Sequence, residues 1–314
     1  MPQPRPDPDA DLTATVETPR RTEARHPAAN GLDTLPGAVV LGHILAQQQA
    51  ALAAVAPAIP DIDHAATLVA DALRTGHRLV YAGAGSSALM ANADGLELHG
   101  TYGIDPDRIL LLMAGGLPVD ARMPGDTEDD DAEGTHAAQA IRPGDTVVAV
   151  TASGRTPYPV AVARAARARG ARVIAVANNP GAPIFALADV AICLATPPEV
   201  IAGSTRMGAG TAQKACLNMI STLAGIRLGQ VHDGMMVGLI ADNDKLRDRA
   251  ERMVTAIADV SPEVARAALA QAGGVVKPAI LVALGEDVDS AVAMLKDADG
   301  NLRAALARIE RAGA

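Results

Sequence analysis

The sequence predicts an α/β fold in which five parallel strands form one sheet, sandwiched by helices, with a small all-helical domain at the C-terminal end. Two observations predict it. Short, continuous apolar runs alternate with helical patterns up to residue 242, and only helical patterns remain beyond residue 243. Strands that are apolar throughout are buried on both faces, which is typical of a parallel sheet covered by helices.

The individual elements follow from apolar runs, turn residues and helical spacing. The predicted strands are 78–82, 109–113, 145–151, 172–177 and 190–194. Helices are expected at 37–55, 61–74, 157–169 and 204–228, with a short one at 182–187. In the C-terminal part, Ser261 before Pro262 is an N-cap signature for a further helix. The last expected helices are 277–284, 288–296 and 301–309.

Three regions are expected from this pattern. Residues 1–34 are rich in proline and charge, so we expect a disordered segment or one draped over the rest. Residues 35–242 hold the α/β domain with its N-terminal helices. Residues 243–314 form the helical C-terminal domain.

The composition limits the classes of function. Apolar residues make up 49% of 314 residues, enough for a large core without disulfides or metals. One Phe, three Tyr and no Trp argue against aromatic platforms for single-stranded nucleic acid. The net charge of −9, without a dense basic run, disfavours nucleic-acid and anionic-membrane partners.

The cysteines and the N-terminal segment indicate a cytoplasmic protein. Cys193 and Cys216 lack a paired spacing, so we expect two buried thiols in a reducing compartment. Residues 1–25 lack the apolar core of a signal peptide. We also expect no membrane partner, because no stretch reads as the roughly 20 apolar residues of a membrane span.

Three polar loops follow predicted strands or enter predicted helices: 83–87, 153–156 and 199–206. Ligands of open parallel sheets bind beyond the carboxyl ends of the strands, so we expect these loops to form a binding site. Their candidate substrate-binding residues are Ser86, Ser87, Ser153, Arg155, Thr156, Glu199, Ser204 and Arg206.

The chemistry of these loops suits a phosphate group. Backbone N–H groups and the dipole at a helix N-terminus favour an anion, and Arg155 can contact a phosphate through two hydrogen bonds. Alternatively, each serine or threonine only caps its helix. The first loop lacks the third glycine of a dinucleotide fingerprint, and no Walker lysine follows it. We therefore expect a ligand that carries a phosphate group, and no cofactor.

Two carboxylates are candidate catalytic groups, although each also has a plain structural interpretation. Glu97 lies ten residues after Ser87 and could be an ordinary surface glutamate. Glu128 belongs to the acidic run 126–133, which by itself predicts a solvated loop, and Asp94 could be a helix-surface charge. His99 has no partner ligands at metal spacing, so no metal site is expected.

The loops resemble those of the sugar isomerase (SIS) domain, and longer stretches resemble the N-acetylmuramic acid 6-phosphate etherase family. The most specific stretch is Gly-Ser-Thr-Arg-Met-Gly-Ala-Gly-Thr-Ala-Gln-Lys at 203–214, continuing through 217–222. Residues 101–103, 114–116, 152–158, 179–180 and 243–246 sit at matching intervals. Thr22-Glu23 and Leu32-Asp33 are similar to the family's N-terminal motif. The resemblance covers residues 22 to 310.

The resemblance implies a fold, a reaction and an assembly. It implies the SIS-type sheet, a homodimer, and conversion of water and N-acetylmuramic acid 6-phosphate into N-acetylglucosamine 6-phosphate and D-lactate during cell-wall sugar recycling. By motif position, Glu97 and Glu128 are the family's two functional carboxylates, with Glu97 the acid and Glu128 the base. General acid–base assistance of this kind accelerates a reaction by about 10²–10⁴-fold.

Several positions depart from the family pattern. Ala88 and Leu89 stand where a Gly-Arg pair is usual, and Gly208 stands where a lysine is usual. Two other functions therefore stay open: a diverged enzyme acting on another amino-sugar phosphate, and a non-catalytic sugar-phosphate-binding regulator. Glu97 and Glu128 favour an enzyme.

Overall fold

A computed structural model describes residues 21–123 and 125–313 of the chain. The predicted disorder of residues 1–20 lies outside the described residues. Residues 21–34 form three short 3-10 turns: η1 (Arg21–Glu23), η2 (Pro27–Ala29) and η3 (Leu32–Thr34). The side chains of Thr22 and Leu32 are buried, and they anchor this part of the N-terminal segment.

The five predicted strands are confirmed to within one residue at each end, and all pair in parallel. They are β1 (Leu79–Gly83), β2 (Ile109–Met113), β3 (Thr146–Thr151), β4 (Arg172–Ala177) and β5 (Val190–Cys193). Their order in the sheet is β2-β1-β3-β4-β5, so the chain turns to opposite sides of β1 for β2 and β3. The point where the order reverses, between β1 and β3, is where open α/β sheets bind ligands.

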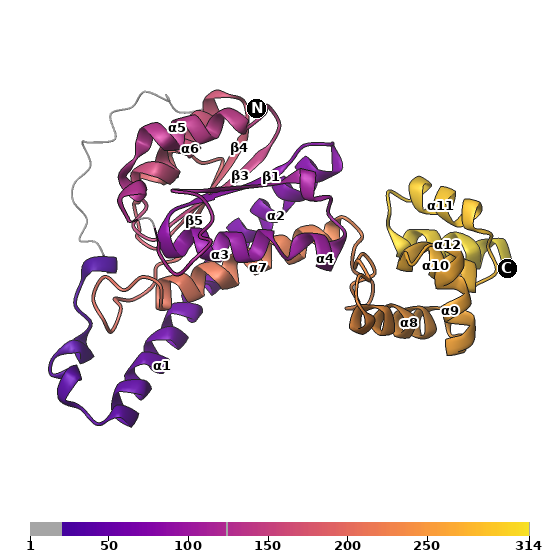
Figure 1. Cartoon of the computed structure of the whole chain (residues 1–314), viewed down its shortest axis with the longest axis horizontal. Coiled ribbons are helices and arrows are strands. Elements are labelled where there is room, and N and C mark those ends of the chain that lie inside the picture. The colour runs from indigo at the N-terminus through magenta and orange to yellow at the C-terminus, as the bar shows by residue number, and fades with distance from the viewer. Residues whose placement is uncertain (1–20, 124, 314) are drawn as a thin grey trace. The chain divides into compact units, whose positions relative to one another are not determined.

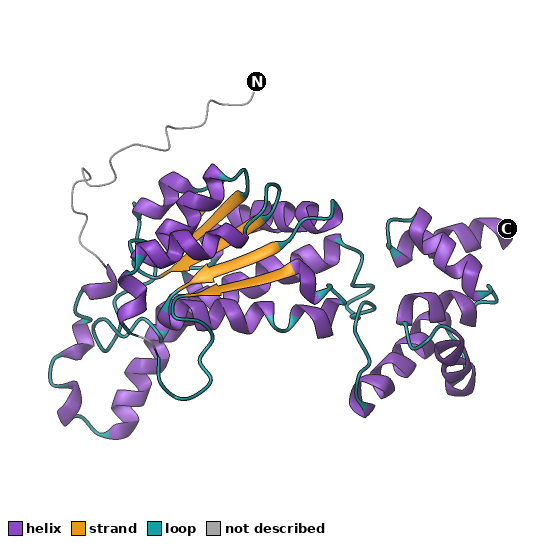
Figure 2. Ribbon diagram, turned by 45° about the horizontal axis from the view of Figure 1, so that its top comes forward, coloured by secondary structure: helices purple, strands orange, loops and turns teal. Residues whose placement is uncertain are grey.

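Helices cover both faces of the sheet (Figures 1 and 2). The helices α5 (Asp131–Ala137) and α6 (Pro157–Ala168) lie on one face. The other face carries α2 (Ile59–Arg74), α3 (Gly85–Gly95) and α7 (Gly208–Arg227). The central strands β1 and β3 are buried along their whole length, as expected for a sheet covered on both sides.

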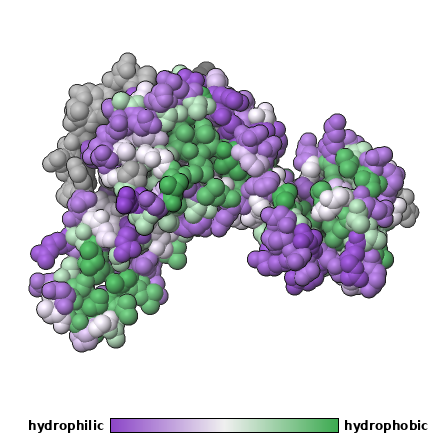
Figure 3. All heavy atoms as spheres, viewed as in Figure 1, coloured by the Kyte–Doolittle hydropathy of each residue, from purple (hydrophilic) through white to green (hydrophobic). Residues whose placement is uncertain are grey.

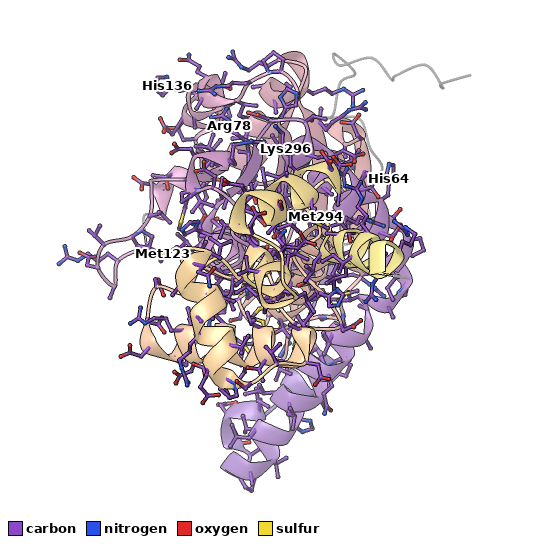
Figure 4. All side chains as sticks on the ribbon, turned by 90° about the vertical axis from the view of Figure 1, so that its right-hand side faces the viewer. His64, Arg78, Met123, His136, Met294 and Lys296 are labelled. Atoms are coloured by element: carbon purple, nitrogen blue, oxygen red, sulfur yellow. The ribbon has the colours of Figure 1, made fainter. Side chains whose placement is uncertain are left out.

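An ion pair ties the starts of the two central strands together. Arg78, labelled in Figure 4, precedes β1, and its Nη2 lies 2.6 Å from Oδ2 of Asp145. The buried Asp145 carboxylate also accepts the backbone N–H groups of Arg78 and Arg142, at 3.0 and 2.9 Å. These contacts hold the pKa of Asp145 below its usual value, against the opposing effect of burial. They fix the end of the sheet opposite the polar loops.

The chain divides into two compact units. Of the described residues, the first unit comprises 21–95, 107–123 and 125–221, and the second comprises 96–106 and 222–313. The second unit contains α4 (Leu98–Tyr102), α8 (Asp244–Ala258), α9 (Pro262–Gln271), α10 (Val276–Ala283), α11 (Val288–Asp297) and α12 (Leu302–Gly313). As predicted, Ser261 caps α9 by accepting the N–H of Val264 at 3.4 Å.

The remaining 3-10 turns are η4 (Ala56–Ala58), η5 (Pro106–Arg108), η6 (Asp126–Asp129), η7 (Ala138–Ala140) and η8 (Pro183–Leu187).

The helix α1 (Gly37–Ala53) belongs to the first unit and carries an exposed apolar face, which Figure 3 shows in green. Leu41 and Leu45, one turn apart, are 67% and 60% exposed. By length and composition alone, the helical stretch 37–74 could cross a membrane, which the sequence analysis did not anticipate, and 17% of its most apolar window is buried. Pro57 and Pro60 divide this stretch, and α1 itself has 17 residues, or about 26 Å, shorter than a bilayer core of about 30 Å.

Candidate active site

A cavity of about 200 Å³ opens beside the carboxyl ends of β1 and β3. Its lining comes from the loops after both strands, from the N-terminal turn η1, from η6 and from the loop before α7. The lining residues are Thr22, Glu23, Ala84, Ser86, Ser87, Glu128, Thr151, Ala152, Ser153, Thr156, Gly203 and Thr205. Three larger cavities, of about 350 to 410 Å³, lie in the second unit, and none is lined by a serine or threonine. The site predicted from the polar loops is therefore the smaller cavity, at the reversal of the strand order.

The loop after β1 supplies two of the predicted residues, Ser86 and Ser87, at the start of α3. Gly85 adopts a left-handed conformation with φ of +52°, which turns the chain sharply from β1 into the helix. The first N–H groups of any helix have no partner within that helix, so this turn presents donors to the cavity together with the two hydroxyls.

The loop after β3 gathers three hydroxyl groups. Thr156 Oγ1 lies 2.8 Å from Thr151 Oγ1 and 3.3 Å from Ser153 Oγ. The same hydroxyls accept backbone donors, since Gly154 N–H bonds to Thr151 and Arg155 N–H bonds to Ser153. Thr156 makes no capping hydrogen bond to α6. Its hydroxyl thus belongs to the cavity cluster, which argues against the capping interpretation for this loop.

Arg155 lies in the same loop and is half-buried. Its side chain is not part of the cavity lining, and within residues 21–123 and 125–313 its guanidinium has no hydrogen bond or ion pair. No lysine or arginine lines the cavity itself among the described residues. Arg155 is therefore the nearest basic side chain in sequence to the hydroxyl cluster.

Glu128 brings a carboxylate to the first loop. Its side chain lies over Gly85, in the space where a Cβ at that position would stand. The carboxylate is half-buried and has no hydrogen bond to another described residue. Burial raises the pKa of Glu128, and the neighbouring Asp129 charge raises it further. A carboxyl group of this kind exchanges protons nearer neutral pH than an ordinary surface glutamate does.

The acidic run around Glu128 is mostly exposed, as expected, but it is helical and not a loop. It forms η6 and then the first turn of α5. Asp130 caps α5 by accepting the N–H of Glu133 at 2.8 Å, and acidic residues in a first turn suit the helix dipole. The run therefore builds structure that places Glu128 at the cavity.

The third loop contributes backbone and hydroxyl groups, while its predicted residues lie elsewhere. Glu199 is 1% exposed, and its oxygens accept the N–H groups of Gly208 and Ala209 at 3.0 and 2.9 Å. The Glu199 side chain thus already occupies the N-terminus of α7, where a ligand anion would otherwise bind. Ser204 is half-buried and Arg206 exposed, and neither lines the cavity, whereas their neighbours Gly203 and Thr205 do.

Glu97, the other predicted catalytic residue, lies outside this cavity. It directly precedes α4, belongs to the second unit and is exposed. Asp94, three residues earlier, is no surface charge: its buried carboxylate accepts hydrogen bonds from Tyr81, Asn218 and Ser221. The structure therefore brings Glu128 together with the hydroxyl loops and leaves Glu97 apart from them.

Sequence reasoning missed the contribution of the N-terminal turn. Thr22 and Glu23 line the cavity, and the Thr22 hydroxyl accepts a hydrogen bond from Asn179 Nδ2 at 3.0 Å. Their similarity to the N-terminal motif of the etherase family is the sequence signal that could have identified them. Among the described residues, no three His, Cys, Asp or Glu side chains gather where they could hold a metal ion.

Comparison with known proteins places the chain in a family. A relative from Deinococcus radiodurans, named N-acetylmuramic acid 6-phosphate etherase, is 41% identical over 298 residues, which are 94% of this chain and 98% of the relative. The chain belongs to the N-acetylmuramic acid 6-phosphate etherase family. A relative with the same name from Symbiobacterium thermophilum is 44% identical, and the match covers 84% of this chain and 88% of the relative. Another, from Streptomyces avermitilis, is 40% identical, and the match covers 96% of this chain and 97% of the relative.

Two further comparisons concern the fold of this etherase-family member. The model of the SIS domain matches residues 45–178. A solved structure from Bacteroides fragilis, described as a phosphosugar isomerase involved in capsule formation, aligns with a TM-score of 0.50 at 19% identity, covering 61% of this chain and 91% of that one. At that identity the likeness shows the SIS fold alone.

The departures from the family pattern have visible structural counterparts in this etherase-family member. Ala88 is buried inside α3, and Leu89 is partly exposed beside it. Gly208 leaves room for the Gln47 amide of α1, because a Cβ at residue 208 would overlap it. Through this buried contact, α1 packs against the start of α7. The Gln47 amide has no hydrogen-bond partner among the described residues.

Proposed function

We propose that this protein cleaves the lactyl ether of N-acetylmuramic acid 6-phosphate, giving N-acetylglucosamine 6-phosphate and D-lactate. The observation that carries the proposal is the name shared by relatives that match nearly the whole chain at about 40% identity. The hydroxyl-lined cavity at the reversal of the strand order supports a sugar-phosphate substrate.

The phosphate of the substrate would bind at the first two loops. Ser86, Ser87, Ser153 and Thr156 offer hydroxyl donors, and Arg155 would turn its guanidinium onto the same oxygens. We place Glu199 outside this contact, since two α7 amides already engage its carboxylate. Ser204 and Arg206 stay candidates for more distant parts of the substrate.

The chemistry requires two carboxyl groups in different protonation states. Opening the sugar ring exposes an aldehyde, which acidifies the hydrogen on the neighbouring carbon. Glu128, as the base, would remove that proton, and protonated Glu97 would help lactate leave from the next carbon. Glu97, now deprotonated, would take a proton from water as the water oxygen adds to that next carbon, and Glu128 would return a proton to the carbon that bears the acetamido group. The raised pKa of Glu128 makes its carboxylate a stronger proton acceptor than an ordinary surface glutamate.

We further propose that the protein works as a cytoplasmic homodimer in which the partner copy supplies Glu97. Glu97 is exposed and does not line the cavity that holds Glu128 of its own chain. The exposed apolar face of α1, including Leu41, Leu45 and Leu52, is the kind of surface that a second copy would cover. A site completed across the dimer would bring the two carboxylates to one substrate.

Product detection tests the reaction directly. The purified protein is incubated with N-acetylmuramic acid 6-phosphate, and lactate and N-acetylglucosamine 6-phosphate are quantified by mass spectrometry. Equal amounts of both products are expected. Tight binding of the substrate without release of lactate would support a regulator, and turnover of another amino-sugar phosphate alone would support a diverged enzyme.

A further inference from the structure

The N-terminal turn η1 is fixed against three loops of the sheet. The Asn179 side chain, after β4, donates to Thr22 Oγ1 at 3.0 Å and to Ala152 O at 3.2 Å. Its Oδ1 accepts the N–H of Arg21 at 2.8 Å, and the Arg21 guanidinium donates to Ala195 O at 3.0 Å. Thr22 is 4% exposed. The residue that follows Thr22 is therefore held at a defined place beside the cavity.

That residue is Glu23, an exposed acidic residue at the rim of the cavity. Glu23 lines the cavity together with Glu128, and its Oε2 lies 3.6 Å from the point where a Cβ on Gly203 would stand. Within residues 21–123 and 125–313, no hydrogen bond or ion pair engages the Glu23 side chain. Two acidic side chains thus line one small polar cavity, and only Glu128 was expected from the sequence.

A carboxylate at this place can accept hydrogen bonds but repels other anions. Phosphate oxygens would avoid it, because two like charges in a partly desolvated cavity raise each other's energy. Sugar hydroxyls and an acetamido N–H are neutral donors, and their hydrogen bonds to a carboxylate are stronger than those between neutral groups. The chemistry of Glu23 therefore selects the uncharged, donor-rich part of a sugar phosphate.

We propose that Glu23 is a substrate-binding residue that accepts a hydrogen bond from a sugar hydroxyl or amide N–H, so that η1 forms a wall of the site. This inference rests on the proposed sugar-phosphate function of the cavity. It gives the N-terminal segment a role in recognition of the sugar, and it separates that role from phosphate binding by the two hydroxyl loops.

Calorimetry with two probes tests this assignment in the full-length protein. Glu23→Ala should weaken binding of N-acetylglucosamine 6-phosphate by about tenfold or more, the loss of one charge-assisted hydrogen bond. Binding of inorganic phosphate should stay unchanged or tighten, because a neighbouring negative charge is removed. Asp33→Asn, an exposed acid in the same N-terminal segment, is the matched control and should change neither affinity.

The two probes also distinguish this inference from the proposed reaction. Unchanged sugar-phosphate affinity in a folded Glu23→Ala variant, with a melting temperature like that of the wild type, would overturn the role of Glu23. Parallel weakening of both probes would overturn it too, since it would indicate a damaged phosphate loop. Wild-type protein that binds the sugar phosphate but releases no lactate would refute the etherase reaction and leave the Glu23 test intact.

Discussion

The carboxylate of Glu128 lies over Gly85, in the space that any side chain at residue 85 would enter. The glycine at the start of the first loop therefore leaves the room that the proposed base occupies. Gly85→Ala would displace Glu128 and also place alanine at a φ of +52°. We expect activity to fall by about 10² or more, the contribution of one acid–base group, with a loss of about 1–2 kcal/mol in unfolding free energy. Steady-state kinetics and thermal unfolding measure the two effects.

Gly76→Ala is the matched control for that variant. Gly76 also has a positive φ, of +92°, but no atom lies within 4 Å of its Cβ position. It precedes β1 at the opposite end of the sheet from the cavity. Gly76→Ala should lose stability to a similar extent and keep its activity. Equal activity losses in both variants would mean that backbone strain, and not displacement of Glu128, is responsible.

The pH dependence of turnover reports the state of Glu128. A base works deprotonated, so activity is lost as pH falls through its pKa. Asp129 is the second cause, after burial, of the raised pKa of Glu128. Asp129→Asn should therefore lower this pKa and move the acidic limb of the kcat/KM profile to lower pH. Asp131→Asn, which neutralises an exposed acid of the same run, should leave the limb in place. An acidic limb that does not respond to Asp129→Asn would argue against Glu128 as the base.

Arg155 tests phosphate binding by the second loop. Arg155 is half-buried in the loop that carries the hydroxyl cluster, and its guanidinium is unpaired among the described residues. Arg155→Ala should weaken N-acetylglucosamine 6-phosphate binding by about 1.5–3 kcal/mol, the scale of a charge-assisted hydrogen bond. Arg164→Ala, on the exposed side of α6, controls for net charge. Calorimetry that finds equal affinities for the two variants would remove Arg155 from the site.

Mixing of inactive subunits tests whether the site is completed across a dimer. Glu97→Gln and Glu128→Gln variants should each be nearly inactive. If the partner supplies Glu97, each mixed dimer regains one intact site, so an equimolar mixture after subunit exchange should recover about one quarter of wild-type activity. Light scattering checks that dimers form. No recovery in a mixture of verified mixed dimers would show that both carboxylates act from one chain.

The sequence predicted the sheet well and the details of the site only in part. Continuous apolar runs identified all five strands. In a strand buried on both faces, successive side chains all enter the core and are therefore apolar. The role of Asp94 was missed, since its partners Asn218 and Ser221 lie more than 100 residues away in the chain. Likewise, the contact between Thr22 and Asn179 joins the N-terminal turn to a loop 157 residues later. Local patterns carry no information about such long-range hydrogen bonds.

The position of Glu97 marks a second limit of sequence reasoning. Its position in the family motif made it a candidate, but a motif position does not determine which cavity a side chain enters. The structure places it in the other unit, exposed at the start of α4. By contrast, Cys216 was expected to be buried and is, with burial raising the pKa of its thiol to about 12, while Cys193 is only half-buried.

Turnover of N-acetylmuramic acid 6-phosphate in heavy water tests the central claim most directly. Elimination and rehydration through the open-chain aldehyde remove the hydrogen from the carbon that bears the acetamido group and return one from solvent. We predict release of D-lactate together with N-acetylglucosamine 6-phosphate that carries one deuterium on that carbon, detected by mass spectrometry. Lactate release with an unlabelled carbon would contradict the elimination mechanism, and binding without lactate release would contradict the etherase function itself.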